Sequence, residues 1–167
     1  MSEFTFDAEQ WLPRPRVEVF PFFAEARNLE ELTPPWLKFE VLTPPPIIMK
    51  PGLLIDYRIK IHGIPISWRT EIVEWDPPHQ FVDTQLSGPY TLWHHTHVFT
   101  EREGGTLCED HVRYRPLGGA LMNWLFVRAD VKKIFAYRKK RLTELFGGIP
   151  SGSSSPVAMK KSEFRKK

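Results

Sequence analysis

Hydrophobic and polar residues alternate along many short stretches of the chain, a pattern typical of strands with one buried face. Residues 3–11 place Phe4, Phe6 and Ala8 on one face of the first predicted strand. Further strands are predicted around Phe39 to Val41 and over residues 53–61, 66–75, 81–86, 90–100 and 106–115. Turns rich in glycine and proline separate them. Because these turns are short, consecutive strands are predicted to pair in an antiparallel sheet.

Helical spacing of apolar residues occurs in two places, after the first strand and at the end of the pattern. Two short helices are predicted over 17–26 and 28–32, the second ending before Pro34 because a residue preceding proline disfavours the helical backbone. A long helix is predicted over 120–146, with a candidate break at 128–130. Its expected apolar stripe consists of Leu121, Leu125, Val131, Ile134, Phe135, Leu142 and Leu145.

The predicted turns set the register of the two hairpins. A turn over 62–65 pairs Tyr57 with Thr70. A turn at Gly104-Gly105 pairs His97 with Val112 and His95 with Tyr114. The inward face of the last hairpin then carries Trp93, His95, His97, Phe99, Asp110, Val112 and Tyr114. The preceding strand places Asp83 opposite His95 and Gln85 opposite Trp93.

Polar side chains on this aromatic face predict a site. A buried polar group left without a partner costs about 1–3 kcal/mol, so these groups form a closed network or line a cavity. We expect a cavity that binds a small hydrophobic molecule. Its predicted lining is Tyr57, Trp68, Thr70, Phe81, Asp83, Gln85, Trp93, His95, His97, Phe99, Asp110, Val112, Tyr114 and Phe135.

Charge is distributed unevenly between the body of the chain and its end. The 167 residues carry a formal net charge of +3. Residues 148–167 hold five Lys and Arg against Glu163, a net +4, which leaves −1 for residues 1–147. We therefore predict one domain over 1–147 and a disordered basic tail over 148–167, with weak membrane-surface contact by that tail as an option. A near-neutral domain disfavours nucleic-acid binding.

Three further features narrow the class of protein. Cys108 is the one cysteine in the chain, so an internal disulfide framework is excluded, and we interpret it as a small buried side chain. Apolar runs are too short to span a bilayer, and the first residues lack the basic and apolar segments of a secretion signal. A cytoplasmic protein is expected.

The order and spacing of these motifs resemble the SRPBCC superfamily, also described as START-like or polyketide cyclase-like. Its closest match within the superfamily is a bacterial group of ligand-binding SRPBCC domain proteins. The resemblance covers about residues 3–147. The residues that carry it include Trp93, His95, His97, Phe99, Gly105, Thr106, Asp110, Val112, Tyr114 and Pro116. It implies an α+β helix-grip fold, in which about seven antiparallel strands wrap a long C-terminal helix and two short helices follow the first strand. It also implies a deep cavity between sheet and helix, and relatives that bind lipids and other hydrophobic molecules.

Three other functions stay open at this stage. The first is a cyclase or dehydratase-type enzyme, in which His95 exchanges protons and Asp83 orients it. The second is a metal site, because His95 and His97 share a strand face and Asp83 or Asp110 could be a third ligand. We interpret these histidines instead as hydrogen-bonded to Asp83, Asp110 and Tyr114, and expect no metal and no cofactor. The third is a protein-interaction module with a vestigial pocket.

Overall fold

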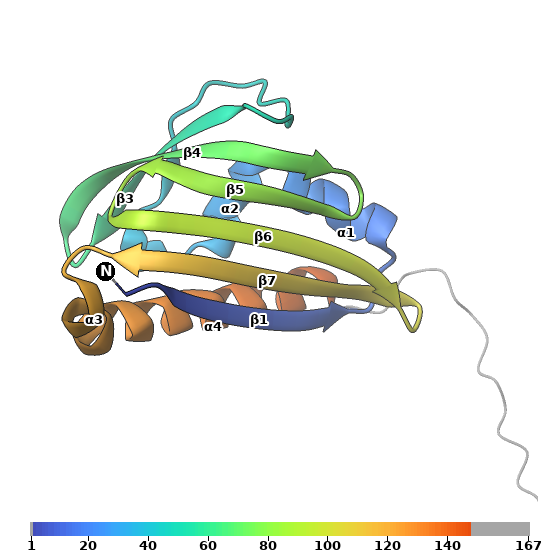
Figure 1. The fold of residues 1–167 in the computed structure, drawn as a ribbon. Coiled ribbons are helices and arrows are strands. Elements are labelled where there is room, and N and C mark those ends of the chain that lie inside the picture. The colour runs from blue at the N-terminus through green and yellow to red at the C-terminus, as the bar shows by residue number, and fades with distance from the viewer. Residues whose placement is uncertain (1, 148–167) are drawn as a thin grey trace, which may run out of the picture.

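A curved antiparallel sheet forms the frame of the molecule. The computed structural model describes residues 2–147, so the predicted tail over 148–167 lies outside the described residues. The seven strands follow the order β1-β7-β6-β5-β4-β3-β2, and the helices cover one face of the sheet (Figure 1). The predicted helix-grip fold is confirmed. Among the described helices, none combines the length and hydropathy of a membrane-spanning segment.

The strands lie close to the stretches of alternating residues that predict them. They are β1 (Phe4–Leu12), β2 (Glu40–Val41), β3 (Leu54–Ile61), β4 (Ile64–Asp76), β5 (Gln80–Ser87), β6 (Tyr90–Arg102) and β7 (Gly105–Pro116). The first and last sheet strands in chain order, β1 and β7, pair antiparallel, with Phe6 opposite Val112. This pairing brings the N-terminal strand beside the final hairpin (Figure 1).

Short helices lie between β1 and β2, and a long helical segment follows β7. They are α1 (Arg16–Ala24), η1 (Ala26–Asn28), α2 (Leu29–Leu32), η2 (Pro35–Leu37), α3 (Gly119–Met122), the π-helical turn η3 (Asn123–Val127) and α4 (Arg128–Phe146). The break that the sequence suggests near Arg128 is thus a change of helix type at η3, without an end to the helix. Tyr114 Oη donates to Asn123 Oδ1 at 3.0 Å and ties η3 to β7.

The predicted registers of both hairpins are wrong by two residues. Tyr57 pairs with Trp68, and His97 pairs with Asp110. Each turn is two residues long and has positive φ at both positions, at His62-Gly63 and at Glu103-Gly104. A non-glycine residue takes the first of these positions in each turn. Because side chains alternate with a period of two, the shift leaves every residue on its predicted face.

The expected apolar stripe of the long helix is buried only between Val131 and Leu142. Val131, Phe135 and Leu142 are buried against the sheet. Leu121 and Leu125, by contrast, are 64% and 44% exposed, and Leu145 is 39% exposed. The π-helical turn changes the angular spacing of the helix, so apolar residues before it and within it do not continue the buried row of α4.

Three separate hydrophobic clusters form the core between the sheet and the helices. The first packs α1 and α4 against the start of β5, the end of β6 and the start of β7. It contains Phe20, Phe81, Phe99 and Leu142. The second lies under β3 and contains Ile55 and Tyr57. The third lies between β7 and α4 and contains Val112, Tyr114, Val131 and Phe135.

Candidate functional site

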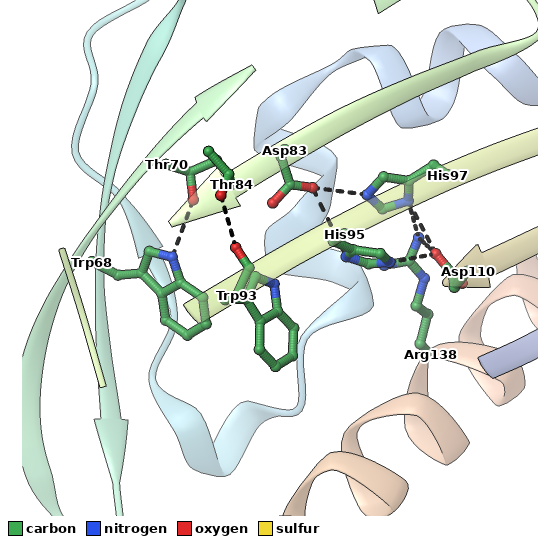
Figure 2. Close-up of polar contacts among 9 residues, drawn as sticks. All are labelled: Trp68, Thr70, Asp83, Thr84, Trp93, His95, His97, Asp110 and Arg138. Carbon is green, nitrogen blue, oxygen red and sulfur yellow. Dashed lines mark hydrogen bonds and ion pairs between the residues drawn. The ribbon is translucent and has the colours of Figure 1, made fainter. Parts of the chain in front are cut away.

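Five charged or titratable side chains meet on the concave face of the sheet. We call Asp83, His95, His97, Asp110 and Arg138 the polar cluster (Figure 2). Asp83 comes from β5, the two histidines from β6, Asp110 from β7 and Arg138 from α4. Alternation along β6 turns His95 and His97 to the same face, and their rings lie 3.7 Å apart between centroids.

The paired imidazoles lie between two carboxylates. On one side, Asp110 Oδ1 is 2.9 Å from His95 Nε2 and 3.0 Å from His97 Nδ1. On the other side, Asp83 Oδ2 is 3.0 Å from His97 Nε2 and 3.8 Å from His95 Nδ1. Each carboxylate therefore faces one nitrogen of each ring (Figure 2).

The predicted neighbour of His95 is only partly right. Asp83 does lie opposite His95 across β5 and β6, as the sequence predicts. The carboxylate that His95 hydrogen-bonds is Asp110, however, because the corrected register sets Asp110 opposite His97 and within reach of both rings. Tyr114, expected to bond a histidine, donates to Asn123 instead.

Arg138 is the member of the cluster that sequence reasoning missed. Its side chain is 8% exposed, and Nη2 lies 3.2 Å from Asp110 Oδ1. The guanidinium also lies over the rings of Phe23 and Phe135, at 5.3 and 5.8 Å from their centroids. Arg138 sits within a run of basic residues typical of a solvated helix face. Its spacing from Val131, Phe135 and Leu142 is the signal that could have placed it on the buried row.

Burial and charge shift the pKa values of the two histidines in opposite directions. Burial and the neighbouring His97 lower the pKa of His95 to about 4, against a hydrogen bond to Asp110 that raises it. Burial would also lower the pKa of His97, but its contacts with Asp110 and Asp83 outweigh burial and raise it. His95 is therefore neutral near pH 7 and carries its proton on Nε2, which donates to Asp110.

The carboxylates are held ionised by their cationic neighbours. Burial would raise the pKa of Asp110, yet the Arg138 guanidinium and the two histidines hold it well below its usual range. Burial would likewise raise the pKa of Asp83, but the hydrogen bond from His97 and the nearby charges lower it. Arg138, together with His97 when that ring is protonated, balances the charges of the two carboxylates, which makes burial of the cluster tolerable.

An aromatic group adjoins the polar cluster on the same concave face. We call Trp68, Tyr90, Trp93 and Tyr114 the aromatic quartet. The Trp93 ring lies 5.5 Å from the Trp68 ring, 4.8 Å from the Tyr90 ring and 6.2 Å from the His95 ring. Three of its members, Trp68, Tyr90 and Trp93, are only partly buried although they face inward. The concave face is therefore not completely covered by protein at this end.

The remaining predicted lining residues take several positions. Thr70 accepts a hydrogen bond from Trp68 Nε1 at 3.1 Å. Phe81 stacks on His97 at 4.1 Å and shares the first core cluster with Phe99. Gln85 hydrogen-bonds the backbone N–H and carbonyl of Tyr90 where β5 turns into β6. Three more, Tyr57, Val112 and Phe135, pack in the second and third core clusters.

Two hollows lie beside the long helix. One, of about 550 Å³, is an open groove between α2 and α4 whose lining includes Glu30, Tyr137 and Arg141. The other, of about 340 Å³, lies between β1, β7 and α4. Among its lining residues are Phe135, Asp110 and Arg138, and the first two are predicted site residues. The second hollow thus reaches the polar cluster from the β1 side.

The chemistry available to the polar cluster follows from His95. A neutral imidazole with Nε2–H held by a carboxylate presents a free lone pair at Nδ1. Such a nitrogen can accept a hydrogen bond, accept a proton or bind a metal ion. Cys108 is not part of this chemistry, since burial raises the pKa of its thiol to about 12.

Comparison with known proteins agrees with the fold. Residues 12–134 match the model of a family described as polyketide cyclase / dehydrase and lipid transport. A search of curated protein sequences gives no match.

Several solved structures share the fold. Ms6760 from Mycobacterium smegmatis is 19% identical, with 86% of this chain and 90% of that chain covered and a TM-score of 0.65. Ara h 8.0201 is 16% identical, with 87% and 98% covered and a TM-score of 0.65. CV1439 from Chromobacterium violaceum is 14% identical, with 87% and 98% covered and a TM-score of 0.69. At these identities the likeness shows the fold alone.

Proposed function

Because the chain belongs to the polyketide cyclase / dehydrase and lipid transport family of the SRPBCC superfamily, we propose that it binds a small hydrophobic molecule between the concave face of the sheet and α4. The observation that carries the proposal is the aromatic quartet. Trp68, Tyr90 and Trp93 face inward and yet keep exposed surface. Inward aromatic surface that the protein itself leaves uncovered is stabilised when an apolar ligand covers it.

The polar cluster gives such a ligand an orientation. Trp93 is a neighbour of His95 both along β6 and in space. A molecule lying on the aromatic quartet therefore has its end next to His95, where a hydroxyl or carbonyl oxygen finds a polar partner. Ligand sites commonly combine mostly apolar walls with a few placed polar groups.

The proposal is tested by recovering the ligand. The purified chain is incubated with a lipid extract, and native mass spectrometry measures the mass of any bound molecule. A stoichiometric adduct that is displaced by an environment-sensitive apolar dye is expected. Dye titration then compares Trp93→Leu with Trp11→Leu, a tryptophan at the opposite end of the sheet whose indole donates to Arg102 O. The first variant is expected to weaken binding by about tenfold, or 1.4 kcal/mol, and the second to leave it unchanged.

Two histidines next to each other on β6 supply a second matched pair. His95→Ala removes a concave-face side chain, whereas His94→Ala removes one from the opposite face. The first is expected to change ligand affinity or selectivity more than the second. Equal effects of the two variants, or a chain that takes up no molecule from the extract and no dye, would refute binding at this face.

A further inference from the structure

The arrangement of three side chains in the polar cluster matches a metal site. One ligand atom from each of Asp83, His95 and His97 lies within 4.8 Å of the other two. Asp83 Oδ2 is 3.0 Å from His97 Nε2 and 3.8 Å from His95 Nδ1. Ligand atoms of a tetrahedral zinc ion with bonds of about 2.0–2.1 Å lie roughly 3.4 Å apart. The two distances bracket that value, so a small adjustment of side chains suffices to admit an ion.

The other side of the two rings supports the same reading. A histidine that binds a metal through one nitrogen usually donates its second N–H to a carboxylate, which fixes the ring and its tautomer. Asp110 Oδ1 takes this position for both rings at once, at 2.9 Å from His95 Nε2 and 3.0 Å from His97 Nδ1. The nitrogens facing Asp83 are then the ones available to an ion, His95 Nδ1 through its lone pair and His97 Nε2 once the ion displaces the proton that this nitrogen shares with Asp83.

Arg138 completes the supporting contacts. Its guanidinium lies 3.2 Å from the same Asp110 oxygen, and its Nε is buried without a hydrogen-bond partner among the described residues. Nη2 also approaches His97 Nδ1 at 3.4 Å. The shorter Asp110 contact decides the direction of the His97 Nδ1–H, and Arg138 then serves to neutralise Asp110. Asp83 is left to supply negative charge to an ion.

From this geometry we infer that Asp83, His95 and His97 form a binding site for a divalent transition metal of the zinc type. Two imidazoles and one carboxylate are ligands that Zn²⁺ and Co²⁺ accept readily, and no thiolate belongs to the set. Three protein ligands leave a fourth position for water or for a polar group of a bound molecule. The inference does not depend on the proposed hydrophobic ligand, because the three side chains are in place without it.

Metal titration of the full chain tests the site directly. The protein is prepared without a histidine tag and stripped with a chelator, and Co²⁺ is added as the spectroscopic probe. One Co²⁺ per chain is expected, with the visible absorption of a low-coordinate nitrogen and oxygen site that Zn²⁺ abolishes. Absence of stoichiometric Co²⁺ and Zn²⁺ binding by the wild-type chain would overturn the inference.

Matched variants locate the bound ion. Asp83→Asn and His97→Gln are expected to weaken Zn²⁺ binding by at least about 100-fold, and Asp110→Asn by about 10–100-fold. His94→Gln and His111→Gln, which alter histidines on the opposite face, are expected to bind as the wild type does. Loss of binding in the opposite-face variants, with retention in Asp83→Asn, would place the ion elsewhere and overturn the assignment.

A measurement on the unaltered protein covers the case in which a variant does not fold. Long-range ¹H–¹⁵N spectra report the ring nitrogens of the six histidines with and without Zn²⁺. Shifts are expected at His95 Nδ1 and His97 Nε2, the nitrogens on the Asp83 side. Shifts confined to His62, His79, His94 or His111 would refute the site. Apolar-dye binding with chelator present keeps this result separate from the test of the proposed ligand.

Discussion

Two histidine–aspartate pairs of almost equal length occupy opposite faces of the same sheet. His95 Nε2 lies 2.9 Å from Asp110 Oδ1 on the concave face, and His111 Nδ1 lies 2.8 Å from Asp7 Oδ1 on the convex face. The side chains of the inner pair are 7% and 13% exposed, and those of the outer pair 49% and 67%. Separation alone does not distinguish the two pairs, whereas their surroundings differ completely.

The two pairs differ in their access to water. The outer pair is hydrated and screened, so such a pair contributes about 0–1 kcal/mol. The inner pair has lost its contact with water and depends on the remaining members of the polar cluster, Asp83, His97 and Arg138. A buried charged group therefore cannot be removed alone without leaving another uncompensated. Geometry shared by two pairs thus predicts neither equal stability nor equal chemistry.

The largest expected effect comes from removing one inner carboxylate charge. Asp110→Asn keeps the shape of the side chain but leaves Arg138 and the two histidines facing a single carboxylate. Loss of one partner from a buried ion pair costs about 3–5 kcal/mol. Urea unfolding at neutral pH measures the change, with Asp7→Asn as its matched control at about 0–1 kcal/mol. Equal losses of unfolding free energy in the two variants would show that burial does not distinguish the two pairs.

The dependence of stability on acid pH also distinguishes the inner pair from the outer pair. The pKa of His95 is lowered from 6.5 to about 4, so below pH 6.5 the unfolded chain binds a proton there that the folded chain does not. Its contribution to stability is therefore complete above pH 6.5 and is lost as pH falls toward 4, by at most about 1.4 kcal/mol per pH unit. His97, whose pKa is raised, has the opposite sign, and its contribution is lost as pH rises through its folded-state pKa.

Unfolding free energies of wild type, His95→Gln and His111→Gln across this acid range test the assignment. The slope against pH, and not the absolute stability, is the quantity compared, since any buried substitution also changes packing. His95→Gln is expected to flatten the curve, and His111→Gln to retain the wild-type slope. An unchanged slope in His95→Gln would mean that this ring is protonated in the folded state.

A smaller loss is expected where a neutral buried hydrogen bond is cut. Tyr114→Phe removes the hydroxyl that donates to Asn123 Oδ1 and leaves that buried amide oxygen without its partner. A group left unpaired costs about 1–3 kcal/mol. Hydrogen exchange of amides in η3 is expected to accelerate along with the loss of global stability. Global destabilisation without faster exchange in η3 would show that the bond does not hold this turn.

The faces of the final hairpin could be predicted from the sequence, whereas its contacts could not. Period-two alternation placed His95, His97 and Asp110 on the concave face, and that assignment survives a slip of two residues. Hydrogen-bond partners do not survive it, since the true register moves Asp110 from Phe99 to His97. The missing information lay in Glu103, a residue type that gives no sign of the positive φ it adopts.

The burial of Arg138 and the exposure of the early part of the long helix were not predicted, for other reasons. A basic run usually indicates a solvated helix face; the helical spacing could have placed Arg138 on the buried row, but it does not identify Asp110 as the carboxylate that Arg138 contacts. Likewise, Leu121 and Leu125 fit an ideal helical stripe only if the helix is α-helical throughout. Tyr114 and Asn123, whose hydrogen bond ties the π-helical turn to β7, belong to a strand and a helix, and the periodicity of neither element indicates that they meet.

The smallest expected effect is at the turn that sets this register, and it is a gain. Glu103 has φ of +53° and Gly104 has φ of +75°, as in a two-residue turn that favours asparagine followed by glycine. Its side chain is exposed and makes one ion-pair contact, with Arg102 at 3.6 Å. Glu103→Asn relieves backbone strain in solvent and is expected to stabilise the chain by roughly 0.5–1 kcal/mol in urea unfolding. Glu103→Val, a β-branched residue at the same φ, is expected to destabilise it.

The same variants also test how the turn affects the polar cluster. The length of the turn sets the register, and the register decides which carboxylate faces which imidazole. Because neither variant changes that length, the contact between His95 and Asp110 is expected to stay intact, as the imidazole ¹⁵N shifts would report. A changed His95 shift in Glu103→Asn would show that the turn and the polar cluster are coupled more tightly than the register alone requires.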